Sequence, residues 1–426
     1  MSLSYVYLLI VVLHLIYLLS NRRMFDLFLI ASLSFYIYHI PYFFGDYHTG
    51  ATVLDLGKPS KEAYYFVISF SLIIFCLNLF FDYRYSHYLN SVAPSYSYSI
   101  NAFTRYLVWS LFYLSLLLFS FSLLITGVEG FKSAKGGGDV GAGMFFYVLS
   151  VWTVMGLSVV AFFCKRYFYL LYSTLIILFH LLVVGSRSWF VIFVLLLVFL
   201  FELRRSKSCR LLFRPIVIFG GPIFLFFILL FEHVGHQIVA LEFGEVLDSL
   251  SNRTTYFRLL ELRESFIVSS HFEFALSAEP LGWYYGVHRV ISFFPLLPGL
   301  WSEIFGGLSR YSDVVLSGYE SVGYGLASNV WAELFHIYGY FGVFVFFCIW
   351  VSLIYKVNYL YLSGAAKPIH YFLMPFFIFL AFYIHRVDFT FVSGFFKYMV
   401  FCYLFVIFSR RFILVFSGKK GGERSL

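Results

Sequence analysis

Arginine side chains without a carboxylate nearby in the sequence are the first candidates for chemistry in this chain. Arg187 opens an apolar run and has no acidic residue within ten positions on either side. Arg253 has no carboxylate three or four positions away, and Arg289 follows His288 without a local partner. A guanidinium group binds phosphate oxygens through two parallel N–H bonds, so these residues are candidates for an anionic ligand. The alternatives are a side chain that extends to lipid headgroups for Arg187, and a distant acid for Arg289.

A second group of polar residues lies in the segment 249–266, which has the pattern of an amphipathic helix. Ser251 or Asn252 can cap this helix, and its apolar residues recur at helical spacing. Arg258 has Glu261 three residues later, which is the spacing of a surface ion pair. We therefore interpret Arg258 first as a structural residue and second as an anion ligand.

A carboxylate stands near the start of the apolar run that follows residue 328. Glu333 lies about one turn inside this run, where a carboxylate is costly unless it is paired, protonated or facing a wet cavity. It is a candidate general base or substrate contact; the alternative is a structural pair with an arginine of the preceding loop. His336 follows one turn later, and packing is its simpler interpretation. Gly339 and Gly342 are expected to permit close approach of another helix.

The elements that must position these residues are membrane helices. With 61% hydrophobic and 12% charged residues and a mean hydropathy of +0.85, the composition indicates an all-α polytopic membrane protein. We predict a single integral membrane domain, 1–426. Eleven apolar runs are long enough to cross about 30 Å of hydrocarbon: 3–20, 24–44, 64–81, 106–126, 144–164, 167–184, 189–203, 211–231, 329–355, 370–388 and 394–416.

The polar chemistry is concentrated in the long loop 232–328, which holds 11 of the 22 acidic residues, five Arg and no Lys. The basic residues of 204–210 and of the other short connections on that side predict the cytoplasmic face. The long loop then faces outward, and the C-terminus lies in the cytoplasm. The formal net charge of +8 is explained by this orientation signal, so nucleic-acid binding is not expected.

The sequence contains no motif for metal binding or for redox chemistry. The five Cys include no CxxC pair, and there is no His-x-x-x-His or Asp-x-Asp spacing. We therefore expect a metal-independent mechanism without a cofactor.

Short motifs in a fixed order, mainly within 140–350, resemble the bacterial O-antigen polymerase family, which is related in architecture to the O-antigen ligases. They are Gly185-Ser-Arg187 opening a span, Ser249-x-x-x-Arg253-x-x-Tyr256 and Glu279-Pro-Leu-Gly282 in the long loop, and Ser328-Asn329, Glu333, Gly339 and Gly342 closing it. The resemblance implies about eleven transmembrane helices around one long, partly helical periplasmic loop in the inner membrane.

The activity that the resemblance implies is transfer of a growing oligosaccharide between undecaprenyl-pyrophosphate carriers. Residues at the positions of Arg187 and Arg253 bind the pyrophosphate in the ligases, and Arg289 and Arg258 are further candidates here. A ligase His is replaced by Ser328, which argues against a ligase. The general base stays open among Glu333, His288 and Glu320. The implied partners are lipid-linked oligosaccharides, membrane lipids and, as a further possibility, a chain-length regulator protein.

Other classes of membrane protein are weighed against this one. A lipid-linked oligosaccharide transporter or flippase usually carries charges inside the helix bundle, short loops and repeat symmetry. Here the acids gather in one loop and no repeat is visible. An O-antigen ligase is the second alternative. A membrane acyltransferase is disfavoured because the sequence has no His-centred motif.

Overall fold

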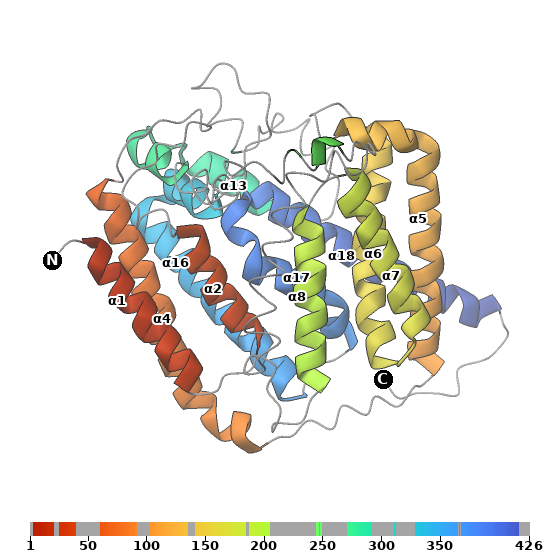
Figure 1. The fold of residues 1–426 in the computed structure, drawn as a ribbon, viewed down its shortest axis with the longest axis horizontal. Helices are drawn as coiled ribbons and strands as arrows, with labels where there is room; N and C mark the ends of the chain where they lie inside the picture. Colours follow the sequence, from red (N-terminus) through yellow and green to blue (C-terminus); the bar gives the residue numbers. More distant parts are fainter. Residues whose placement is uncertain are drawn as a thin grey trace. The chain divides into compact units, whose positions relative to one another are not determined.

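The fold of this chain is helical throughout the part that the computed structural model describes (Figure 1). The described residues are 3–20, 25–39, 60–91, 102–134, 141–184, 187–204, 244–246, 248, 271–291, 311, 329–364, 366 and 368–416. The helices are α1 (Leu3–Ser20), α2 (Leu27–His39), α4 (Lys61–Ser91), α5 (Ala102–Ala134), α6 (Gly141–Phe163), α7 (Tyr167–Phe179), η1 (His180–Val184), α8 (Arg187–Arg204), α13 (Trp283–Ile291), α16 (Val330–Leu362), α17 (Pro368–Phe382), η3 (Ile384–Arg386) and α18 (Phe389–Phe416).

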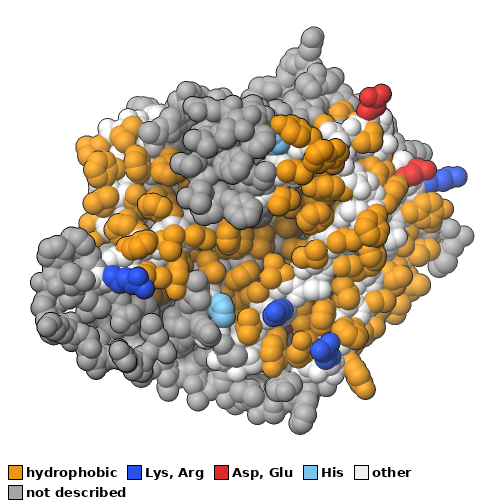
Figure 2. All heavy atoms as spheres, turned by 180° about the vertical axis from the view of Figure 1, so that it is seen from behind, with side chains coloured by type: hydrophobic (Ala, Val, Ile, Leu, Met, Phe, Trp, Pro, Cys, Tyr) orange, Lys and Arg blue, Asp and Glu red, His pale blue; other side chains and the backbone are white. Residues whose placement is uncertain are grey.

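Five helices in this part of the chain are long and apolar enough to cross a membrane, and their apolar cores are 61–85, 106–127, 145–163, 330–362 and 389–408. Five shorter apolar helices accompany them: 3–18, 27–39, 167–182, 188–203 and 370–382. Hydrophobic side chains dominate the described part of the face shown in Figure 2. These features agree with a helical membrane protein. The predicted run 211–231 and the predicted helix at 249–266 lie outside the described residues, so the count of eleven spans stays a prediction.

The chain divides into two compact units, and the prediction of a single domain is not tested by this division. The first unit comprises Met1–Pro94, Leu197–Ala365 and Phe377–Gly394. In it α1 packs along α4, and α16 packs on α2 and α4. The short helix α13 lies on α16, and η3 contacts both α2 and α16. This unit contains every residue of the site described below.

The second unit comprises Ser95–Leu196, Ala366–Phe376 and Phe395–Leu426. Helix α6 packs on α5 and α7 there. The Tyr147 hydroxyl lies 2.6 Å from Nδ1 of His180, at the start of the π-helix η1. Trp152, Trp189 and Phe395 pack their rings against one another, with centroids 4.8–5.1 Å apart. A buried aromatic core thus joins α6, α8 and α18 within this unit.

Two helices of the first unit begin at polar residues that cap their free N–H groups. The side chain of Asn329 accepts hydrogen bonds from the backbone of Trp331 and Ala332, at 2.9 and 3.4 Å, and so starts α16. Asp388 accepts a hydrogen bond from the backbone N–H of Phe391 at 2.8 Å and starts α18. Such caps satisfy donors that have no partner within the helix. They fix where the two apolar helices begin.

Helix α16 contains a break at Gly339, whose φ of 65° and ψ of −166° belong to a region that essentially only glycine adopts. A Cβ at this position would meet no atom of the described residues within 4 Å. The prediction that Gly339 permits close helix approach is therefore wrong for this part of the chain, and the backbone conformation is what requires the glycine. At Gly342 a Cβ would meet Tyr338 of the same helix. The close approach of two helices is instead at Gly286 of α13, where a Cβ would meet Tyr338 and Ile337 of α16.

Candidate functional site

The short helix α13 brings polar side chains of the long loop against the first turns of α16. Its Tyr285, Gly286, His288 and Arg289 are buried. The opposite face is exposed and apolar, and it consists of Trp283, Tyr284, Val287 and Val290. Helical spacing separates these two faces. Helix α13 therefore turns the face that carries Arg289 toward the protein.

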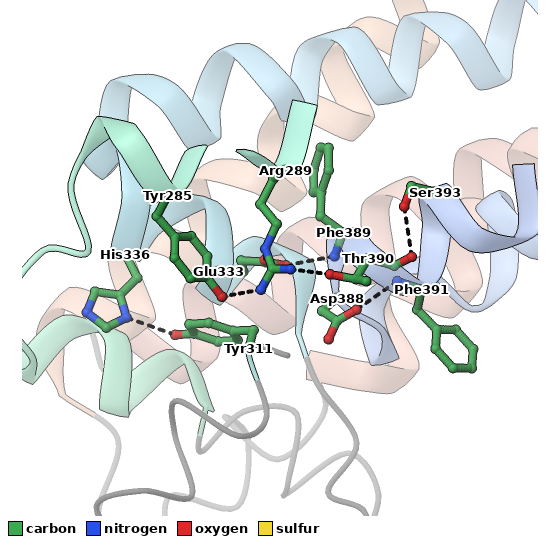
Figure 3. Close-up of polar contacts among 10 residues, drawn as sticks. All are labelled: Tyr285, Arg289, Tyr311, Glu333, His336, Asp388, Phe389, Thr390, Phe391 and Ser393. Atoms are coloured by element: carbon green, nitrogen blue, oxygen red, sulfur yellow. Dashed lines mark hydrogen bonds and ion pairs between the residues drawn. The ribbon is translucent and has the colours of Figure 1, made fainter. Parts of the chain in front are cut away.

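Arg289 is 3% exposed and is engaged through all three of its nitrogens (Figure 3). Its Nε lies 2.7 Å from Oε1 of Glu333, an ion pair without an aligned hydrogen bond. Its other two nitrogens donate hydrogen bonds to the hydroxyl groups of Thr390 and Tyr285. The guanidinium carbon also lies 4.5 Å from the centroid of the Tyr285 ring. In this arrangement Arg289 holds α13 to two other elements and does not face an open anion site.

Glu333 stands in the first turn of α16 and is completely buried, with an exposed fraction of 0%. One carboxylate oxygen faces Arg289, and the other accepts a hydrogen bond from the backbone N–H of Phe389 at 2.7 Å. Glu333 therefore binds an arginine of the loop, which is the structural alternative considered from the sequence. The side chain joins α13, α16 and the start of α18 at one point.

Asp388 is a second buried carboxylate beside this pair, and its exposed fraction is 4%. Its Oδ1 accepts the capping hydrogen bond from Phe391. No described residue donates a hydrogen bond to its second oxygen, which points away from the start of α18 in Figure 3. Asp388, Glu333 and Arg289 together bring two carboxylates and one guanidinium into one buried cluster.

His336 holds the loop against α16 one turn beyond Glu333. Its Nε2 makes a short hydrogen bond with the backbone carbonyl of Glu279, and its Nδ1 lies 3.3 Å from the Tyr311 hydroxyl. The backbone N–H of Leu281 donates to the carbonyl of His336 at 3.0 Å. These contacts agree with the packing interpretation of His336.

The titratable loop residues around the cluster are shifted toward their neutral forms. Burial raises the pKa of Tyr285 to about 12; the charges of Glu333 and Asp388 act in the same direction, and Arg289 opposes them. Burial likewise raises the pKa of Tyr311. The pKa of His288 is lowered by burial and by the neighbouring Arg289. At neutral pH both tyrosines keep their hydroxyl protons, and His288 is uncharged.

The residues singled out from the sequence fall into three groups. The structure brings Arg289 and Glu333 into direct contact and places His288 beside Arg289 on α13. Arg187 is the first residue of α8, and its side chain is outside what the structure describes. Arg253, Arg258 and Glu320 also lie outside the described residues.

Sequence reasoning missed three members of the site, which are Tyr285, Thr390 and Asp388. Asp388 had a signal that could have found it, because it is an acidic residue in the connection 386–397, predicted to lie on the same side as the long loop. Tyr285 and Thr390 had none. Neutral hydroxyl groups are common at such positions, and only the fold places them on the guanidinium group.

Within the described ranges, no three His, Cys, Asp or Glu side chains gather as a metal ion requires. No family model, curated protein or solved structure matches this chain. Fold and composition therefore define its class, a helical membrane protein, and the buried polar cluster at the ends of its apolar helices is the feature from which a function must be argued.

Proposed function

We propose that this protein is a membrane glycosyltransferase of the O-antigen polymerase type. It joins undecaprenyl-pyrophosphate-linked oligosaccharides into a surface polysaccharide at the periplasmic face of a bacterial inner membrane. In this proposal the loop 232–328 is periplasmic and the C-terminus is cytoplasmic. The growing chain moves from its lipid carrier to a hydroxyl group of a new repeat unit, and undecaprenyl pyrophosphate leaves.

The observation that supports this proposal is the buried cluster of Arg289, Glu333 and Asp388. A helix of the long polar loop meets the first turns of two apolar helices there. Ionisable groups at such a depth are costly and usually serve function. Their position at helix ends suits an enzyme whose substrates hold their lipid in the membrane and their sugars in water.

The role that we propose for Arg289 follows from its contacts. It has protein partners on all three nitrogens, so we assign it a positioning role. Arg187 and Arg253, with Arg258 as a further candidate, then remain for the pyrophosphate leaving group. Charge develops on this group as the glycosidic bond breaks, and fixed guanidinium donors stabilise it. A basic group within hydrogen-bond reach of the attacking hydroxyl completes the mechanism.

Complementation tests this proposal. The gene is deleted in its own host, and tagged wild type, Arg187→Ala, Arg253→Ala and a control, Arg166→Ala, are returned at matched membrane levels. Arg166 is exposed and lies on the connection before α7. Wild type and the control should restore a ladder of polysaccharide on a gel. The other two variants should leave mainly a single repeat unit, because losing one such donor costs about 10²–10³ in rate.

Two results would contradict parts of this proposal. If the deletion strain lacks surface polysaccharide of every length, the missing step is export or attachment, and a transporter or a ligase explains the gene. If both arginine variants restore a full ladder, the pyrophosphate roles are wrong even though polymerisation stands.

One observation favours the transporter as a second candidate. His14 is buried among α1, α2 and α4, with Nδ1 2.6 Å from the Tyr36 hydroxyl and Nε2 3.0 Å from the Asn78 amide. Polar side chains buried within apolar helices commonly mark transport pathways. A transporter predicts lipid-linked repeat units that accumulate on the cytoplasmic leaflet of the deletion strain, whereas a polymerase predicts their appearance at the cell surface as single units.

A further inference from the structure

Among the described residues of the cluster, the second carboxylate oxygen of Asp388 is an acceptor with neither a hydrogen bond nor an ion pair, whereas Glu333 Oε1 has the ion pair with Arg289. Asp388 is more than nine-tenths buried, and its Oδ1 and backbone carbonyl are used by Phe391 and Val392 at the start of α18. No described residue donates a hydrogen bond to the remaining oxygen. Figure 3 shows this oxygen directed away from the helix that the residue caps. An ionised carboxylate oxygen is a hydrogen-bond acceptor, so a bound hydroxyl group would donate to it.

The described part of the cluster holds two carboxylates and one guanidinium group. Arg289 contributes one positive charge, whereas Glu333 and Asp388 contribute one negative charge each when both are ionised. The ionised cluster therefore has one negative charge in excess, in a buried environment where charge interactions are strong. A proton received by either carboxylate removes that excess.

Glu333 is poorly placed to receive that proton from a substrate. Its exposed fraction is 0%, and its two oxygens face the Arg289 guanidinium and the Phe389 N–H. Protonation there would weaken the tie that holds α13. Asp388 can take a proton on its open oxygen while Oδ1 continues to cap α18. The geometry therefore separates a positioning carboxylate from an accepting one.

We propose that Asp388 is the general base of the transfer reaction and that Glu333 positions Arg289; this inference rests on the proposed function. The oxygen of the attacking sugar hydroxyl bonds to the anomeric carbon of the lipid-linked donor. The bond from that carbon to the pyrophosphate oxygen breaks, and its electron pair leaves with undecaprenyl pyrophosphate. The hydroxyl proton passes to the open oxygen of Asp388 and is released to water after the product leaves.

The test compares three substitutions that separate capping from proton acceptance. Asn and Ser cap helices about as well as Asp, whereas Glu is not among the favoured capping residues. Only Glu retains a carboxylate. Asp388→Asn, Asp388→Ser and Asp388→Glu are returned to the deletion strain, and polymer formation from its own lipid-linked repeat units is measured in isolated membranes. Rates are divided by the amount of tagged protein.

A matched control comes from Asp26, another buried aspartate that caps a helix. Its Oδ1 accepts a hydrogen bond from Leu29 at 2.7 Å at the start of α2, and its Oδ2 accepts one from Asn358 at 3.1 Å. Asp26→Asn should polymerise at nearly the wild-type rate per molecule. This control measures how the polymerisation rate changes when a buried capping carboxylate without an assigned catalytic role is lost.

A catalytic base predicts that Asp388→Asn and Asp388→Ser lose about 10²–10⁴ in rate while Asp388→Glu retains more activity than either. A cap alone predicts the reverse order, with Asn and Ser close to wild type and Glu the weakest. The reverse order, or wild-type rates in all three, would overturn the role of Asp388 and leave polymerisation standing. If wild type itself forms no polymer, the proposed function fails instead.

Discussion

At the scale of single residues, burying the charges of Arg289 and Glu333 costs free energy of hydration, and removing only one of the two side chains would destabilise the protein further. Two charges that leave water lose several kcal/mol of hydration each, and their attraction offsets this only when further polar contacts are made. Here Tyr285, Thr390 and the Phe389 N–H supply those contacts. A buried pair of this kind specifies which surfaces of two elements meet.

A double-mutant cycle tests this view of the pair. Arg289→Met and Glu333→Met should each lower the free energy of unfolding by about 3–5 kcal/mol, because each leaves one buried charge without its partner. The double variant should be less destabilised than the sum of the two. Thermal unfolding in detergent, at fixed protein and detergent concentration, measures all three.

The control for this cycle is Arg84→Met in α4. Arg84 is exposed, and its guanidinium carbon lies 5.9 Å from the Tyr85 ring centroid, a contact of about 1 kcal/mol at most. Its loss should change the stability little. Strictly additive effects of the Arg289 and Glu333 variants would show that the two side chains are not coupled.

At the scale of elements, α16 is two helical pieces joined at Gly339. The first piece carries Glu333 and His336, which hold the loop. The second piece continues as an apolar helix to Leu362. The break thus separates the part that binds the loop from the longer apolar part of the helix.

Replacement of two glycines by alanine tests the break. Gly339→Ala should destabilise the protein by about 1–3 kcal/mol, since its backbone conformation is one that alanine adopts only with strain. Gly394→Ala in α18 is the matched control. A Cβ has open space at both positions, but Gly394 has ordinary helical geometry, where alanine should be neutral or stabilising by up to about 1 kcal/mol. Equal melting temperatures for the two variants would contradict a required break.

The elements also show where sequence reasoning was sufficient and where it ended. In the described part of the chain, each long apolar run coincides with a helix that starts near the predicted start, because the hydrophobic stretch is visible in the sequence. Three helices end well beyond the predicted runs: α4 ends at Ser91, α5 at Ala134 and α16 at Leu362. The predicted run 370–388 extends too far at its C-terminal end, because α17 ends at Phe382 and Asp388 caps the next helix. The signal for that end is a few polar residues between two apolar runs, too weak to locate a helix boundary.

At the scale of the whole molecule, the orientation in the membrane remains a prediction from the distribution of Lys and Arg. It concerns which side of the membrane holds the loop 232–328 and which holds the C-terminus. The pairing of Arg289 with Glu333 shows why the contacts within the site could not be predicted from the sequence. Each charge was conspicuous in the sequence, but which acid meets which arginine depends on how α13 lies on α16.

Reporter fusions test the predicted orientation. Alkaline phosphatase fused after residue 270 should be active, because this enzyme folds only outside the cytoplasm, and a green fluorescent protein fused after residue 416 should fluoresce. Fusions of both reporters after residue 207, in the basic connection, serve as the internal control, and only the fluorescent one should be active there. The opposite pattern would reverse the orientation and remove the periplasmic site.

The contacts of Arg289 also set an order of events during synthesis. Thr390, which receives one of its hydrogen bonds, lies 101 residues later in the chain, and Phe389 lies 56 residues after Glu333. The ribosome must therefore complete and release the start of α18 before the cluster can close. Until then Arg289 lacks its contact with Thr390, and Glu333 lacks its contact with the Phe389 N–H. A chain that stops short of residue 390 is expected to be a substrate for membrane proteases, so the cluster also distinguishes complete chains from unfinished ones.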